Sequence, residues 1–65
     1  MTLEEAQHRI QQAIEQFGPH AAPALDLIIS EVRSSLGAGS ANDLIDEFDL
    51  ELGYGIAPSD PESGD

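Results

Sequence analysis

Ala22-Pro-Ala-Leu-Asp-Leu-Ile-Ile-Ser-Glu-Val-Arg-Ser-Ser-Leu36 is the stretch of sequence around which the rest of the chain must pack. Proline near its start is tolerated because the first turn of a helix has no partner for its N–H. Asp26 lies in that first turn, where the helix dipole favours negative charge, and Gly37 supplies the stop. Apolar residues recur at three- and four-residue steps, at Leu25, Ile28, Ile29, Val32 and Leu36.

Leu27 lies nearly opposite that apolar stripe on a helical wheel. A helix that buried one face only would leave Leu27 in water. The sequence therefore predicts a second packing surface for this helix.

An earlier helix is predicted to begin at Thr2-Leu-Glu-Glu5, which has the spacing of a capping box. Its apolar positions recur at helical steps, at Leu3, Ala6, Ile10, Ala13, Ile14 and Phe17. Gly18-Pro19 should end it near Phe17, because proline cannot continue the helix.

Residues 1–36 are thus expected to form an antiparallel helical hairpin in an all-α fold. Two amphipathic helices cover each other only partly, and a second copy packing as a four-helix bundle would bury the remainder. The side chains predicted to make this homodimer are Ile10, Ile14, Phe17, Leu25, Leu27, Ile28, Ile29, Val32 and Leu36. Of the two basic residues, Arg9 could pair with Glu5, and Arg33 with Asp26 or Glu31.

The remaining chain is predicted to hold a flexible linker over residues 37–41, a third helix over 42–53 and a disordered, proline-rich acidic tail over 54–65. A capping signal at Ser40 to Asp43 opens the third helix. On a helical wheel its apolar residues share one narrow sector, comprising Leu44, Ile45, Phe48 and Leu52. Its carboxylates border that sector, so a partner groove should be apolar at the floor and basic at the rims. A helix of about twelve residues is marginal alone, and we expect this one to order on binding.

Charge and composition limit the kinds of partner that the chain can bind. The 65 residues carry 13 acids and two bases, net charge −11. Residues 1–40 account for −3 of this and residues 41–65 for −8, which excludes nucleic acid and anionic membranes as natural partners and favours a basic protein. There is no cysteine and no long apolar run, so a cytoplasmic location is expected.

Asp43-Leu-Ile-Asp-Glu-Phe-Asp-Leu-Glu-Leu-Gly53 resembles the last helix of C-terminal docking domains of modular type I polyketide synthases. In that family, two helices dimerise as a four-helix bundle, a linker follows, and the third helix docks on the basic N-terminal coiled coil of the next synthase polypeptide. The resemblance implies a non-catalytic role in ordering the subunits of an antibiotic-type biosynthetic assembly. Carried over by position, the partner-binding residues are Leu44, Ile45, Asp46, Phe48, Asp49, Glu51 and Leu52.

Two departures from the family pattern stand out: Ile45 replaces a frequent phenylalanine, and Glu47 replaces a position that is often aromatic or aliphatic. The alternative is a free-standing acidic inhibitor or adaptor that covers a basic site on a larger protein. An enzyme is not expected, because no nucleophile elbow, P-loop or glycine-rich nucleotide motif occurs. No cofactor or metal is expected either.

Overall fold

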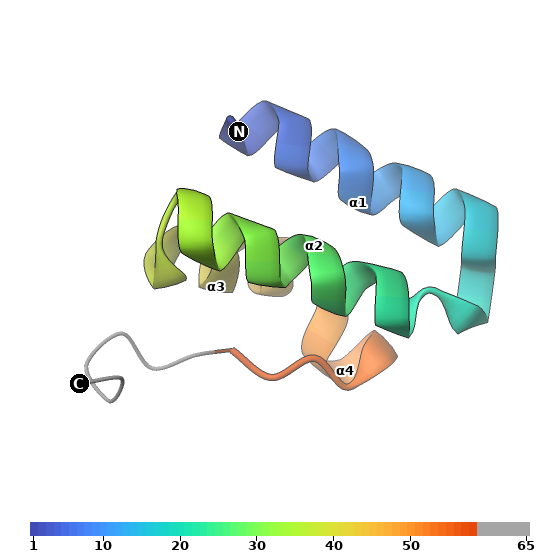
Figure 1. The fold of residues 1–65 in the computed structure, drawn as a ribbon. Helices are drawn as coiled ribbons and strands as arrows, with labels where there is room; N and C mark the ends of the chain where they lie inside the picture. The colour runs from blue at the N-terminus through green and yellow to red at the C-terminus, as the bar shows by residue number, and fades with distance from the viewer. Residues whose placement is uncertain (59–65) are drawn as a thin grey trace.

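The computed structural model describes residues 1–58, and over these the chain is helical with no strand. The elements are α1 (Leu3–Phe17), a 3₁₀ turn η1 (Gly18–His20), α2 (Ala22–Ser35), α3 (Ala38–Glu47) and α4 (Leu50–Tyr54). Helices α1 and α2 form an antiparallel hairpin, α3 runs back along the side of α2, and α4 closes the end of the bundle (Figure 1). The predicted all-α class is confirmed.

Helix α1 begins at the predicted capping box. The Glu5 amide donates to the Thr2 hydroxyl at 3.1 Å, and the Thr2 amide donates to Glu5 Oε1 at 3.1 Å. The helix ends at Phe17, as predicted, because Gly18 adopts φ +56°, which β-carbon-bearing residues rarely enter. The chain then turns through η1 into α2, whose start at Ala22 is also as predicted.

Both helices of the hairpin bury most of their stripes against the same core, while Leu3 and Phe17 at the two ends of α1 stay exposed. That core also contains residues of α3, α4 and the segment after α4. Its fully or nearly fully buried members are Ala6, Ile10, Ala13, Ala21, Leu25, Ile28, Ile29, Val32, Ala41, Leu44, Ile45, Leu50 and Ile56.

The predicted linker over residues 37–41 is wrong in extent. Helix α2 ends at Ser35, and α3 already begins at Ala38. Leu36 and Gly37 make the whole connection, with both amides donating to the Val32 carbonyl and Gly37 at φ +100°. Helix α3 thus includes Gly39 and Ser40, although both have weak helix propensity. Burial of Ala41 and Leu44 against the hairpin outweighs that weakness. The predicted cap at Ser40 is absent.

The predicted single helix over 42–53 is broken into two. Asp49 takes the left-handed conformation, φ 54° and ψ 44°, between the end of α3 and the start of α4. In an unbroken helix Leu50 would lie opposite Leu44 and Ile45, since residues advance by about 100° each. The break turns Leu50 into the core, where it is fully buried, and turns Leu52 out, leaving it 85% exposed. The turn at Asp49 therefore determines that Leu50, and not Leu52, packs in the core.

The predicted tail of residues 54–65 also begins too early. Tyr54 closes α4 and is half-buried against the core, while Ile56 is buried at 7% exposure, its amide donating to the Leu50 carbonyl at 3.2 Å. Burial of Ile56 thus holds residues 54–58 against the core, although glycine and proline flank it. Residues 59–65 lie outside the described part of the chain.

The hairpin does not need a second copy to cover its stripes. Seven of the nine side chains predicted to dimerise are buried or partly buried in the chain's own core, to which α3, α4 and Ile56 also contribute. Only Phe17, at 46% exposure, and Leu27, at 59%, remain open to solvent. The predicted position of Leu27 away from the core is confirmed.

Candidate protein-binding site

The four apolar side chains predicted to fill a partner's groove do not form one exposed face. Leu44 is fully buried, Ile45 is 2% exposed, and Phe48 is half-buried against the core. All three stabilise the fold, so their assignment as free docking residues is wrong for this conformation. Their wheel sector was correctly identified, but its partner is the α1–α2 hairpin of the same chain.

Leu52 is the exception. It lies on α4 and is the most exposed large hydrophobic side chain among residues 1–58. Exposed single leucines are common on proteins, but this one is flanked by Glu51 and follows the acidic turn at Asp49. Leu52 is the one predicted groove-filling residue that remains available to a partner.

The carboxylates of α3, the turn and α4 are all exposed. This acidic edge consists of Asp43, Asp46, Glu47, Asp49 and Glu51. No basic residue occurs anywhere in residues 37–58 to offset them. Glu47 bonds to another helix, accepting from the Gln7 side-chain amide of α1 at 3.0 and 3.3 Å. Asp46, Asp49 and Glu51, predicted to contact the partner, are thus placed where a partner could reach them.

The two arginines differ in their surroundings. Arg9 of α1 pairs with Glu31 of α2, with Nη1 2.6 Å from Oε1, rather than with the predicted Glu5. The hydrogen bond from Arg9 lowers the pKa of the Glu31 carboxyl below its ordinary value and raises the pKa of Arg9 in turn. Arg33 makes neither predicted ion pair, and its Nε is buried without a hydrogen-bond partner among the described residues.

A second surface lies between α1 and α2 around the two exposed hairpin hydrophobics. This hairpin face is a shallow hollow of about 210 Å³, lined by Arg9, Gln12, Ala13, Gln16, Phe17, Ala24, Leu27 and Ile28. No carboxylate lines it. On a chain of net charge −11, a face without acids is unusual and is the surface where like-charged copies would repel least.

The titratable side chains of residues 1–58 do not cluster as metal ligands. Residues 1–58 contain no group of three or more histidine or acidic side chains arranged to hold a metal ion. Both histidines, His8 and His20, are exposed. Within the same range, no helix combines the length and the apolar character needed to cross a bilayer.

Comparison with known proteins adds no relative: no protein-family model, curated protein or solved structure matches the chain.

Proposed function

We propose that the chain is a non-catalytic protein-binding module that presents its acidic edge and Leu52 to a basic protein surface. The observation that carries the proposal is the combination of five exposed carboxylates with an 85% exposed leucine, in a segment without a single base. Opposite charge on the partner would accelerate encounter, and an apolar pocket for Leu52 would slow dissociation.

The resemblance to polyketide synthase docking domains supplies the more specific proposal. The chain would join one synthase polypeptide to the basic N-terminal coiled coil of the next, with Asp46, Asp49 and Glu51 selecting the partner. Leu52 would be the apolar contact, while Leu44, Ile45 and Phe48 would hold α3 in place from the core side. This assignment differs from the one that the resemblance alone implies, in which all four apolar residues bind the partner's groove.

Homodimerisation through the hairpin face belongs to the same proposal. Phe17 and Leu27 would pack against their counterparts across a two-fold axis, with uncharged Gln12 and Gln16 at the rim. Such a dimer would hold out two equivalent acidic edges. The alternative, a free-standing acidic inhibitor or adaptor, shares the basic partner but requires no dimer.

The binding experiment uses a synthetic parallel two-stranded coiled coil whose rim positions are lysine, titrated into the full chain at low and high salt. We expect binding that weakens as salt screens the charges. Neutralising three carboxylates of the acidic edge (Asp46→Asn, Asp49→Asn, Glu51→Gln) should weaken binding of the coiled coil strongly. A control that neutralises three hairpin acids (Glu4→Gln, Glu15→Gln, Asp26→Asn) makes the same change in net charge and should weaken it less.

Leu52→Ala separates specific docking from general attraction, because it leaves every charge in place. Loss of affinity with unchanged salt dependence supports the proposal. Equal affinity of the two charge-neutralised variants, together with no effect of Leu52→Ala, would contradict it. Sedimentation equilibrium then decides the symmetry: Leu27→Asp should convert a dimer to a monomer, whereas Leu52→Asp should not.

A further inference from the structure

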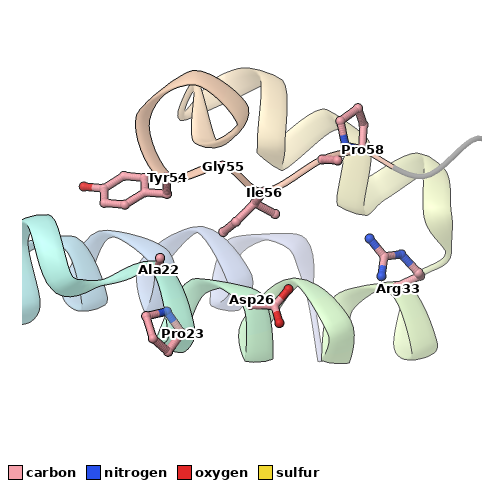
Figure 2. Close-up of a pocket in the computed structure, with 9 residues that line it drawn as sticks. Ala22, Pro23, Asp26, Arg33, Tyr54, Gly55, Ile56 and Pro58 are labelled. Atoms are coloured by element: carbon pink, nitrogen blue, oxygen red, sulfur yellow. The ribbon is translucent and has the colours of Figure 1, made fainter.

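An open hollow of about 660 Å³ lies between α2 and the segment that follows α4. Residues 54–58 run along α2, with Tyr54 near Ala22, Pro58 near Arg33 and the Ile56 side chain pointing toward the helix, and the hollow lies between this segment and α2 (Figure 2). Its exposed lining is mainly polar, with Asp26, Arg33 and the Tyr54 side chain among residues that also contribute apolar side chains; the full set is Ala22, Pro23, Asp26, Arg33, Tyr54, Gly55, Ile56, Ala57 and Pro58. This C-terminal hollow shares no residue with the acidic edge or the hairpin face.

Arg33 marks one end of the C-terminal hollow. It forms no ion pair with any residue of 1–58, although ten of the chain's 13 acids lie in that range. Its Nε is buried with no hydrogen-bond partner in that range, and its guanidinium lies below Pro58 (Figure 2). A buried donor on a charged group without an acceptor is unfavourable, and the guanidinium fork matches the two oxygens of a carboxylate. Among residues 1–58, no carboxylate pairs with this guanidinium.

Asp26 marks the other end. It is exposed, lines the same hollow and lies seven residues before Arg33 on α2. Seven residues at 1.5 Å each separate the two positions by about 10.5 Å along the helix axis. The two side chains do not form an ion pair with each other. The hollow therefore presents a cation and an anion at its two ends.

The net charge of the chain selects among ligands for Arg33. A simple anion would be repelled by a molecule of charge −11. A ligand with one negative and one positive group has no net charge to repel, and Asp26 attracts its positive end. An extended peptide spans about 3.3–3.6 Å per residue, so roughly three residues would bridge the two ends.

From this geometry we propose that the C-terminal hollow binds a short zwitterionic peptide segment, with its carboxylate on Arg33 and its ammonium or guanidinium group near Asp26. The exposed rings of Pro23 and Pro58 line the hollow between the two charges and would contact the rest of the peptide. The two charges can come from the free termini of a tripeptide or from acidic and basic side chains within a longer strand. The proposal is independent of binding at the acidic edge.

The test titrates two probes into the full chain and follows the Arg33 Nε–H cross-peak by NMR. The first probe is alanyl-leucyl-alanine with free termini, and the second is acetyl-lysyl-leucyl-glutamyl-amide, with its charges on side chains. A saturable shift of the Arg33 signal with either probe supports the proposal, and the stronger probe identifies the source of the charges. The first peptide with both ends blocked should give no shift.

Arg33→Gln should weaken binding about tenfold or more, as expected for loss of a charged hydrogen bond. Asp26→Asn should weaken it about two- to fivefold, since that ion pair is exposed. Arg9→Gln, which removes the other arginine, is the matched control and should leave affinity unchanged. The Arg33→Gln variant has no Arg33 Nε–H signal, so its binding is measured from other residues of the hollow, such as the Ile56 amide. The affinities of the variant and the parent chain can then be compared on the same signal. Arg33→Lys keeps the charge and removes the fork, and intermediate affinity is expected.

Three outcomes would overturn the proposal: no shift with either probe at tens of millimolar, equal shifts with the blocked peptide, or undiminished affinity in Arg33→Gln. A scalar coupling across a hydrogen bond from Arg33 Nε–H to a carboxylate of the chain itself would also overturn it, because the guanidinium would then already be occupied. A helical circular dichroism spectrum identical to that of the parent chain establishes that each variant is folded.

Discussion

The α1–α2 hairpin and the α3–α4 region share one core but are stabilised differently. The hairpin has a capping box at its start, an ion pair between its helices and both arginines of the chain, for a net charge of −3 over residues 1–36. Residues 37–58 have five acids and no base, no side-chain cap on either helix, and a left-handed aspartate between them. Burial of apolar side chains is what holds the second region to the first.

The contrast shows how an acidic segment can be both structural and available for binding. Leu44, Ile45 and Leu50 face inward and anchor the region. The carboxylates and Leu52 face outward. No basic residue of this region offsets the repulsion among the carboxylates. A basic partner would supply the missing counter-charge, so binding and added stability of α3–α4 are expected to go together.

The largest expected effect comes from removing the anchor of α3. Leu44→Ala should destabilise the chain by about 2–5 kcal/mol, the usual cost of emptying a buried leucine site. A core of this size rarely supplies more than about 3–5 kcal/mol in total, so the variant should be largely unfolded. Urea denaturation followed by circular dichroism measures this.

Leu52→Ala is the control for Leu44→Ala, since the same chemical change at an 85% exposed position should alter stability by no more than about 0.5 kcal/mol. If Leu44→Ala instead retained the helical signal of a stable hairpin, α1 and α2 would fold without α3, and the shared core would be refuted.

The turn between α3 and α4 gives the next effect. Asp49→Ala should cost about 1 kcal/mol more than Asp49→Gly, because a β-carbon at φ 54° is strained and glycine is not. Both variants remove the same negative charge, so their difference isolates the backbone. Thermal unfolding of the pair measures it, and equal melting temperatures would mean that Asp49 does not need the left-handed conformation.

Relieving repulsion in the acidic region should give a smaller, stabilising effect. Asp46 lies three residues after Asp43, near the negative end of α3, and Asp46→Asn should stabilise by a few tenths of a kcal/mol. Glu15→Gln, near the same end of α1 but without a carboxylate one turn away, should gain less. Chemical denaturation at low salt compares them, and a larger gain at Glu15 would contradict the contrast between the two regions.

The smallest effect concerns the ion pair of the hairpin. Because Arg9 lowers the pKa of Glu31 in the folded chain, the pair stabilises the fold above the ordinary value of 4.5 and loses that contribution as pH falls through the lower folded value. A carboxyl-carbon NMR titration should give Glu31 a midpoint below 4.5. In Arg9→Gln the midpoint should move back up; an unchanged midpoint would mean that another group causes the shift.

Much of the hairpin could be predicted from sequence because its signals are local. Thr2 and Glu5 satisfy each other within one turn, Gly18-Pro19 ends a helix by backbone geometry, and Leu27 departs visibly from a regular stripe. The ion pair was mispredicted because Arg9 to Glu31 is a contact between helices, and sequence spacing within one helix favoured Glu5.

The α3–α4 region was harder because its structure depends on the hairpin. The glycines at 37 and 39 indicate flexibility locally, yet burial of Ala41 and Leu44 draws Gly39 into a helix. The break at Asp49 cannot be read from a helical wheel that assumes a continuous helix, so Leu50 was missed and Leu52 was grouped with Leu44, which the fold buries. The exposure of Asp46, Asp49 and Glu51 needed only their charge to predict.

Amide hydrogen exchange of the free chain tests most directly whether α3 belongs to the fold. The sequence alone predicted that this helix orders on binding, but burial of Leu44 and Ile45 in the chain's own core reverses that expectation. In the chain without any partner, we expect the amides of Leu44, Ile45 and Phe48 to be protected to the same degree as those of Ile28, Ile29 and Val32 in α2, since both groups open only when the shared core opens. Rapid exchange across α3 while α1 and α2 stay protected would contradict the account.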